Sequence, residues 1–308
     1  MKTGDFYSSG KLLLTGEYLV MYGALALAIP LKKGQHMSVT RGESEGRLDW
    51  KARMLDKDWF SAEFDLPGFN IISASDQRLA EFLKKLLQSA AAMRPEYFTS
   101  RQSFTIQTNL EFDIRWGLGS SSSLVSNIAL WLELDPYLYF SQNFPGSGYD
   151  VFCARSKKPI LYRLIDGQPE VSPTPFRPTF LQSIYFVYLG TKQDSQESVV
   201  KFKSSSTISE ASKSEISDLT VQLANTGSLE EFMKIISMHE EIMSAILGIQ
   251  AIGPSRFFDF PGAIKSLGAW GGDFIMAVSS EPQLRIRDYF ASRGLEVIFP
   301  YTELALDF

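Results

Sequence analysis

The stretch FTIQTNLEFDIRWGLGSSSSLVSNIALWL, residues 104–132, decides the fold. Apolar and polar side chains alternate from Phe104 to Trp116, which predicts a half-buried strand over those residues. A turn of glycine and serine follows at residues 117–122. Beyond the turn, apolar residues recur at helical spacing from Leu124 to Leu132, which predicts a buried helix. The sequence therefore predicts a strand, a turn of small residues and a helix in direct succession.

The turn has the sequence Gly117-Leu118-Gly119-Ser120-Ser121-Ser122. Free backbone N–H groups at a helix N-terminus attract an anion, and small residues let a phosphate approach the backbone. Two better-known phosphate patterns do not fit. The P-loop spacing fails between Gly4 and Lys11, and Ser122 stands where a dinucleotide loop needs its third glycine. An ordinary serine-capped helix behind a turn is the alternative, and the turn alone does not decide between them.

Three further segments place small residues beside a charged side chain. They are Ser9-Gly10-Lys11 with Gly16-Glu17-Tyr18, Pro145-Gly146-Ser147-Gly148-Tyr149-Asp150, and Lys265-Ser266-Leu267-Gly268-Ala269-Trp270-Gly271-Gly272-Asp273. A lysine beside a glycine turn can pair with phosphate oxygens, and exposed backbone beside an aspartate suits a polar substrate. Each segment also has an ordinary explanation, as a strand edge, a glycine-rich turn or a helix-to-strand connection. Each is weak alone, but their order along the chain is informative.

The composition excludes several classes of protein. The chain has 308 residues, enough for about two domains, and a formal net charge of −5. An acidic total argues against broad nucleic-acid binding. One cysteine and two histidines leave little material for disulfides, a zinc site or a Ser-His-Asp triad. The single cysteine fits a reducing, cytoplasmic setting, and we expect His36, His239 and Cys153 to be structural.

Outside the motifs, strands and helices mix in both halves, so the predicted class is α+β. A cluster of prolines between Pro169 and Pro178 suggests a domain seam. Strands are predicted over 181–189 and 274–278. Helices are predicted over 216–248, broken near Thr226-Gly227, and over 284–292. No signal peptide or membrane span is evident, because Glu17 and two glycines interrupt the most apolar early run.

In this order the four segments resemble the motifs of the GHMP kinases. The resemblance extends from Ser9 to Val278. It implies a two-lobed fold, with a ribosomal-protein-S5-like lobe over residues 1–168 and a ferredoxin-like α/β sandwich over 169–308. It also implies that the γ-phosphoryl group of ATP passes to a small molecule between the lobes, with Mg²⁺ as cofactor. We expect a monomer or homodimer with no nucleic-acid or membrane partner.

The resemblance assigns roles to individual residues. Lys11 and Asp150 are the implied catalytic residues, and Gly117, Leu118, Gly119, Ser120, Ser121 and Ser122 the implied ATP-binding residues. A hydroxyl of Ser120 or Ser121 would reach Mg²⁺. The implied substrate-binding residues are Glu17, Tyr18, Ser147, Gly148, Lys192, Gly271 and Gly272.

Within the family the motifs are most similar to those of phosphomevalonate kinases, because Glu17-Tyr18 replaces the Glu-His usual in mevalonate kinases. The expected pathway is therefore isoprenoid synthesis from mevalonate, with a mevalonate kinase as the alternative and a decarboxylase of the pathway third. A phosphomevalonate oxygen is already ionised and needs cations to hold it, whereas a mevalonate hydroxyl gains from a base. The candidate cations are Arg115, Arg155, Lys157, Lys158 and Lys192.

Two departures from the family motivate a further alternative, a degenerate protein that binds nucleotide without turnover. The short stretch from Leu124 to Pro145 lacks a matching magnesium-binding glutamate, and Glu133 and Asp135 are the nearest acids. Trp270 occupies a position that is usually glycine. A serine hydrolase is disfavoured, because there is no G-x-S-x-G elbow.

Overall fold

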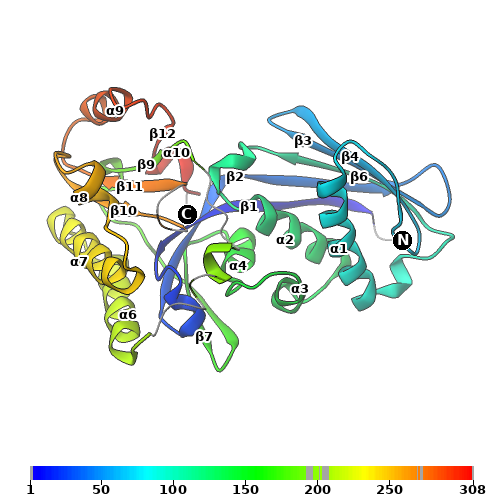
Figure 1. Cartoon of the computed structure of the whole chain (residues 1–308), viewed down its shortest axis with the longest axis horizontal. Coiled ribbons are helices and arrows are strands. Elements are labelled where there is room, and N and C mark those ends of the chain that lie inside the picture. Colours follow the sequence, from blue (N-terminus) through cyan, green and yellow to red (C-terminus); the bar gives the residue numbers. More distant parts are fainter. Residues whose placement is uncertain are drawn as a thin grey trace.

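The chain folds around two β-sheets (Figure 1). The computed structural model describes residues 3–191, 197–200, 202, 208–268, 270 and 273–306. Within those ranges the large sheet has eight strands in the order β5-β4-β3-β6-β2-β7-β8, with β1 paired to β2. Its strands are β1 (Gly4–Thr15), β2 (Ala26–Arg41), β3 (Arg47–Met54), β4 (Lys57–Asp65), β5 (Ile71–Ala74), β6 (Ser103–Leu110), β7 (Ile160–Ile165) and β8 (Gln168–Pro173). The β3–β6 pair is parallel, and the other strand pairs of this sheet within the described ranges are antiparallel.

Four helices lie along one side of the large sheet (Figure 1). They are α1 (Gln77–Met93), α2 (Ser120–Leu132), α3 (Pro136–Asn143) and α4 (Tyr149–Arg155). Inward residues of the strands, such as Phe104 and Ile106, pack on Val125, Ile128 and Trp131 of α2 in one buried cluster. The alternation in β6 and the helical spacing in α2 both arise from this contact. Short 3-10 turns occur at η1 (Leu19–Tyr22), η2 (Pro95–Tyr97), η3 (Ile114–Trp116) and η4 (Leu181–Ser183).

The small sheet is covered on both faces. Its antiparallel order is β10 (Ala263–Ser266), β11 (Phe274–Val278), β9 (Ile184–Tyr188) and β12 (Ile298–Pro300). The helices of this region are α6 (Glu210–Asn225), α7 (Leu229–Leu247), α8 (Ile252–Arg256), α9 (Gln283–Ala291) and α10 (Tyr301–Leu304). Ile184 and Phe186 of β9 pack toward α6 and α7, whereas Tyr185 and Val187 pack toward α8 and α9. Because successive side chains of a strand face opposite ways, one strand serves both layers.

The two sheets share one hydrophobic core. Leu27 and Ile29 of β2 belong to the same buried cluster as Phe186 of β9 and Phe232 of α7. The end of the chain returns to the large sheet, where Leu31 forms an isolated bridge with Ala305. The lobes are therefore joined by packed side chains, not only by the connecting chain.

The predicted α+β class and the strand–turn–helix unit are confirmed, but the strand predicted over Phe104–Trp116 is too long. β6 ends at Leu110, and the chain turns into η3. The Glu111 carboxylate accepts a hydrogen bond of 2.8 Å from the backbone N–H of Gly34, and the Asp113 side chain accepts one from the N–H of Arg115. The Asp113 bond is local and turns the chain out of the strand, whereas the Glu111 bond reaches across to β2. Phe112 stays buried in the core shared by the sheets, so its apolar character reflects packing outside a strand.

The other predicted elements fit with shifts at their ends. The predicted helix break at Thr226-Gly227 is confirmed, because α6 ends at Asn225 and Ser228 caps α7 by accepting from the N–H of Glu231. The strand over 274–278 is confirmed, and η4 occupies the first residues of the strand predicted over 181–189. β8 still pairs with β7, so the chain leaves the large sheet only after Pro173. The division into lobes at residues 168 and 169 stays a prediction.

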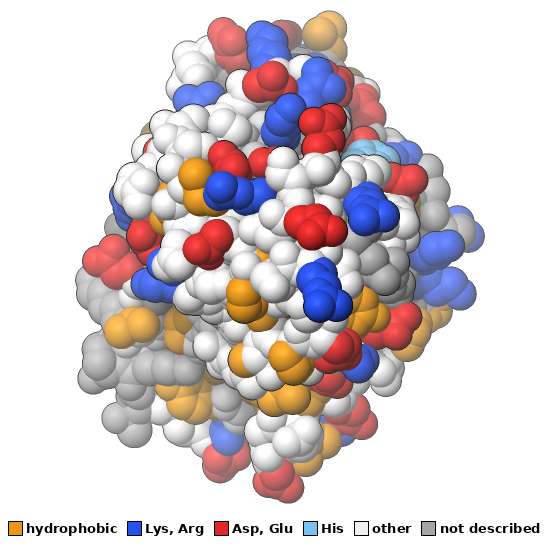
Figure 2. Space-filling view, turned by 90° about the vertical axis from the view of Figure 1, so that its right-hand side faces the viewer, with side chains coloured by type: hydrophobic (Ala, Val, Ile, Leu, Met, Phe, Trp, Pro, Cys, Tyr) orange, Lys and Arg blue, Asp and Glu red, His pale blue; other side chains and the backbone are white. Residues whose placement is uncertain are grey.

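None of the helices within the described ranges combines the length and apolar character that a membrane crossing requires. At the far end of the large sheet, the coloured acidic and basic side chains are interspersed (Figure 2). Among the described residues, that face offers nucleic acid no continuous basic surface.

Substituting Phe186 with alanine tests the shared core. Phe186 is fully buried between the sheets, so we expect the free energy of unfolding to fall by about 3–5 kcal/mol. Because residues of both lobes touch the same cluster, tryptophan fluorescence and far-UV circular dichroism should report one coincident transition in denaturant. Phe258→Ala is the control, because Phe258 is 81% exposed. Two separate transitions in the wild-type protein would contradict a common core.

Candidate active site

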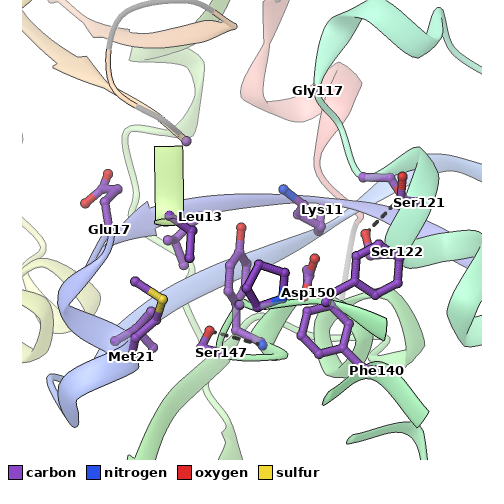
Figure 3. Close-up of a pocket in the computed structure, with 18 of the residues that line it drawn as sticks. Lys11, Leu13, Glu17, Met21, Gly117, Ser121, Ser122, Phe140, Ser147 and Asp150 are labelled. Carbon is purple, nitrogen blue, oxygen red and sulfur yellow. Dashed lines mark hydrogen bonds between the residues drawn. The ribbon is translucent and has the colours of Figure 1, made fainter. Parts of the chain in front are cut away.

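The four sequence segments meet around one cavity of about 550 Å³. Lys11 and Leu13 of β1 form its floor, and Glu17, Tyr18 and Met21 extend one wall (Figure 3). The turn before α2, the segment between α3 and α4, and the start of β11 supply the other walls. The further lining residues are Val20, Gly117, Gly119, Ser120, Ser121, Ser122, Phe140, Phe144, Pro145, Gly146, Ser147, Tyr149, Asp150, Val199, Gly268 and Asp273. The site is therefore built by both lobes.

The glycine-serine turn lies directly on β1. The backbone N–H of Lys11 donates a hydrogen bond of 2.9 Å to the carbonyl oxygen of Leu118. Gly119 has a φ of 96°, in the left-handed region that favours glycine. A Cβ there would lie 3.0 Å from Cγ of Lys11 and 2.8 Å from Oγ of Ser122. This close approach leaves no room for a side chain.

Gly119 is also the N-cap of α2, so no side chain caps the first turn of that helix. The first N–H groups of a helix have no partner within the helix and carry its positive dipole end. Ser121 is exposed at the cavity, whereas the Ser122 hydroxyl donates a hydrogen bond of 3.0 Å to the Gly119 carbonyl oxygen. The turn therefore places the uncapped start of a helix at the cavity, an arrangement that can receive an anion and that we call the anion cradle. That it binds phosphate stays a prediction.

Lys11 and Asp150 face the same cavity (Figure 3). Burial disfavours the Lys11 ammonium, but Tyr149, Asp150 and Asp273 outweigh that effect and raise its pKa. Burial also raises the pKa of Asp150, and the Lys11 charge limits that rise. The Lys11 Nζ atom lies 5.5 Å from the centre of the Tyr149 ring, and burial raises the pKa of that phenol to about 12. The floor thus holds a cation and a carboxylate that interact in a water-poor setting.

Backbone contacts and a tight turn fix the segment Pro145-Gly146-Ser147-Gly148, which precedes α4. The Tyr162 hydroxyl donates to the Ser147 carbonyl oxygen, and Ser147 is buried at the cavity wall. Gly148 is the N-cap of α4 with a φ of 82°, and a Cβ there would lie 2.9 Å from the Tyr137 ring. Gly148 therefore shapes the turn and does not line the cavity. The predicted substrate residues Lys192, Gly271 and Gly272 lie outside the described residues.

A second polar cluster lies behind the cavity. Lys265 of β10 forms an ion pair with Glu17 and lies 3.6 Å from Oε1 of Glu240. His239 of α7 accepts a hydrogen bond of 3.3 Å at Nε2 from the backbone N–H of Gly16. Glu17 is 1% exposed and Lys265 is fully buried. The Glu17 carboxylate, predicted to contact substrate, is thus bound by the other lobe, and we assign it a role in positioning the Glu17–Met21 wall.

Two acids and one ammonium share this buried cluster, so neutrality requires that one acid be protonated. Burial raises the pKa of Glu17 to about 7, and burial also raises the pKa of Glu240. Burial, aided by Lys265, lowers the pKa of His239 well below its usual value, so its imidazole is neutral. Oε2 of Glu17 lies 3.4 Å from Nε2 of His239.

Four of the cations predicted to hold an acceptor do not line the cavity, and the fifth, Lys192, lies outside the described residues. Arg115 is exposed and pairs with Asp113. Arg155, Lys157 and Lys158 are also exposed, and none of them lines the cavity. Among the described lining residues, Lys11 is the one cation. The structure adds Asp273 to the cavity wall, a residue to which the motifs assign no role. In the sequence, its position between Gly271-Gly272 and an apolar strand is the signal that marks it.

Within the described part of the chain, no three His, Cys, Asp or Glu side chains are grouped closely enough to hold a metal ion by themselves. A metal at this cavity would therefore need oxygen ligands from a bound molecule. Mg²⁺ commonly binds in that way, through one or two carboxylates together with substrate phosphates.

Solved structures share this fold. A Streptococcus pneumoniae phosphomevalonate kinase, in complex with phosphomevalonate and AMPPNP, matches with a TM-score of 0.71 and 17% identity, over 96% of this chain and 99% of that one. A Methanococcus jannaschii mevalonate kinase matches with a TM-score of 0.71 and 16% identity, over 99% of both chains. A Lactococcus lactis galactokinase complexed with galactose matches with a TM-score of 0.66 and 14% identity, over 99% of this chain and 93% of that one.

No protein-family model and no curated protein matches the sequence. At these identities, the structural similarity establishes the fold, which is that of the GHMP kinases. The fold predicted from the order of the motifs is confirmed.

Replacing Glu17 with glutamine tests the buried cluster. The folded-state pKa of Glu17 is raised, so the folded protein holds its proton more tightly than the unfolded chain does. That contribution to stability is present below pH 4.5 and is lost as the pH rises to about 7. Glutamine imitates the protonated acid, so the stability of Glu17→Gln relative to wild type should rise across this window by as much as ~3 kcal/mol.

The measurement is denaturant unfolding of both proteins at several pH values. His239 has an opposing effect, because its lowered pKa makes stability rise with pH up to the usual histidine pKa of 6.5. Comparing the two proteins separates this effect from that of Glu17. A stability difference that does not change with pH would show that Glu17 is charged throughout.

Proposed function

We propose that this protein is an ATP-dependent kinase that transfers the γ-phosphoryl group to a small-molecule acceptor. One observation carries the proposal: the anion cradle at the start of α2 lies against a half-buried Lys11, and Asp150 faces the same cavity. Phosphoryl transfer needs positioning and charge neutralisation more than covalent chemistry, so a site without cysteine or histidine in its wall suffices. The fold similarity to solved GHMP kinases supports the proposal.

Each group of residues would have a role in the reaction that follows from its position in the cavity. Backbone N–H groups of residues 119–122 would bind the β- and γ-phosphates, since these residues line the cavity at the N-terminus of α2. Lys11 would stabilise negative charge on the transferred group. Its ammonium is retained at neutral pH because the anionic neighbours raise its pKa. Asp150 would orient the acceptor and take its proton.

The donor set fits a magnesium–nucleotide complex. Hard oxygen ligands are available at the cradle, where Ser120 and Ser121 line the cavity beside the Asp273 carboxylate. Bound Mg²⁺ would neutralise phosphate charge during transfer. The serine hydroxyls remain predicted ligands.

The acceptor predicted first from the sequence is phosphomevalonate, with mevalonate as the alternative. The similarity in fold does not separate them, because the TM-score is 0.71 for both kinases. The residues that line the cavity do bear on the choice between the two acceptors. A phosphate dianion calls for several cations, and Lys11 is the one described cation in the wall. A lysine beside a carboxylate suits a neutral hydroxyl, so the described residues favour the mevalonate type of acceptor.

A degenerate protein without turnover was the further alternative, and Trp270 was one reason for it. The Trp270 side chain is buried in the apolar cluster with Leu19 and Met243, and it does not line the cavity. It therefore leaves the space for nucleotide open.

Lys11→Met tests the proposed activity. We expect kcat for ADP release to fall by about 10²–10⁴-fold, because the charge facing the transferred group is lost. The assay couples ADP release to acceptor, using mevalonate, phosphomevalonate, homoserine and galactose with the wild-type protein and the variant. Lys33→Met, at an exposed position on β2, is the matched control and should retain wild-type turnover. An unchanged rate for Lys11→Met on the acceptor that the wild type uses would reject this active site.

Asp150→Asn separates the two acceptor types. If the acceptor is a hydroxyl, the variant should lose about 10²–10⁴-fold in kcat, because a general base is removed. An ionised phosphate oxygen needs no base, so turnover of phosphomevalonate should be far less affected. Faster wild-type turnover of phosphomevalonate than of mevalonate would restore the acceptor predicted from the sequence.

A further inference from the structure

Asp273 brings a carboxylate into the anion cradle. It lies at the start of β11 and is 7% exposed, and its backbone carbonyl accepts a hydrogen bond of 2.9 Å from the N–H of Leu189. A Cβ on Gly117 would be 2.5 Å from Oδ2 of Asp273, so the carboxylate packs directly on the backbone of the turn. Asp273 also lines the cavity. Asp273, which directly precedes β11 of the small sheet, thus places a negative charge at the turn where nucleotide phosphates would bind.

A carboxylate beside a polyphosphate is unfavourable unless a cation lies between them. Lys11 is the described cation of the wall, and it is also in the field of Tyr149 and Asp150. The positive charge of the Lys11 ammonium does not balance the negative charges of both a nucleotide phosphate and the Asp273 carboxylate. The arrangement calls for a further positive charge that arrives with the nucleotide.

The other acids of the cavity wall have different partners. Glu17 is bound to Lys265 behind the wall. Asp150 lies on α4 and, like Asp273, raises the pKa of Lys11. Outside the wall, Asp135 caps α3 by accepting from the N–H of Leu138 at 2.7 Å, and Glu133 follows the end of α2; neither lines the cavity. Among the described acidic residues, Asp273 is the one that lines the cavity and also packs on Gly117 of the glycine-serine turn.

We propose that Asp273 is the carboxylate ligand of the divalent cation that accompanies the nucleotide. This inference rests on the proposed kinase function. In this assignment, Asp273 supplies the magnesium-binding carboxylate that the short segment from Leu124 to Pro145 lacks. Mg²⁺ needs only one or two protein carboxylates when phosphate oxygens and waters complete its octahedron. A single carboxylate at the cradle is consistent with a wall that lacks a three-residue metal cluster. Because Asp273 comes from the small lobe, the cation would link the two lobes across the nucleotide.

The test measures binding of the non-hydrolysable analogue AMPPNP by calorimetry, with Mg²⁺ and with EDTA, to the wild type and Asp273→Asn. If Asp273 binds the cation, the variant should bind metal-free AMPPNP more tightly than wild type, because a repulsive charge is gone. It should bind Mg²⁺–AMPPNP more weakly. The gain in affinity that Mg²⁺ provides should fall by about tenfold or more. Electron paramagnetic resonance of Mn²⁺ in the AMPPNP complex should show a matching loss of Mn²⁺ affinity.

Asp273→Ser guards against a variant that folds poorly. Glu296→Gln, at an exposed position two residues before β12, controls for the loss of a negative charge and should keep the gain from Mg²⁺. A structural role for Asp273 predicts weaker binding of AMPPNP with and without metal, and this result would overturn the proposal. So would an unchanged gain from Mg²⁺ in both Asp273 variants. If the wild-type protein binds no AMPPNP under any condition, the kinase function fails as well, so the two failures are distinguishable.

Discussion

The contact between the glycine-serine turn and β1 is the constraint on which the site depends. A backbone hydrogen bond joins Lys11 to Leu118, and glycines at positions 10 and 119 leave no side chain between the two segments. That approach sets the start of α2 over the Lys11 side chain. Helix dipole and ammonium then act on the same small volume, in which burial strengthens both. A chain with a net charge of −5 acquires its local positive field here.

The second constraint is the union of the two lobes. Apolar residues of both sheets share one core, and the Glu17–Lys265 pair crosses the same seam. A buried ion pair is weak evidence for stability, because desolvation offsets its attraction. Its value here is geometric, since it fixes the loop that continues β1 into the wall at Tyr18. Tyr18 itself has a φ of 59°, a strained conformation that the surrounding contacts must hold.

Local patterns were sufficient to predict much of the fold. The alternation in β6, the glycines of the turn and the helical spacing of α2 each reflect neighbours in sequence, so the strand–turn–helix unit was predictable. The end of β6 was not, because Asp113 forms a local turn that periodicity does not reveal. Lys11 and Asp150 were identified only through the order of the motifs, since no local rule joins residues so far apart.

The buried cluster around Glu17 and Lys265 could not be predicted from the sequence. Its members come from the loop after β1, from α7 and from β10, and tertiary packing alone brings them together. His239 was expected to be structural, and its burial beside Glu17 agrees with that. The contact of Asp273 with Gly117 joins the two lobes in the same way. Such long-range contacts decide which of several charged residues face the cavity and which, like Arg115, remain at the surface.

The most direct test of the account is a crystal structure of the protein with AMPPNP, Mg²⁺ and the acceptor that supports turnover. The account predicts phosphate oxygens within hydrogen-bond distance of the backbone N–H groups of residues 119–122. It also predicts an acceptor oxygen facing both the Lys11 ammonium and the Asp150 carboxylate. A nucleotide whose phosphates lie away from this turn, or an acceptor held where neither side chain reaches it, would contradict the account.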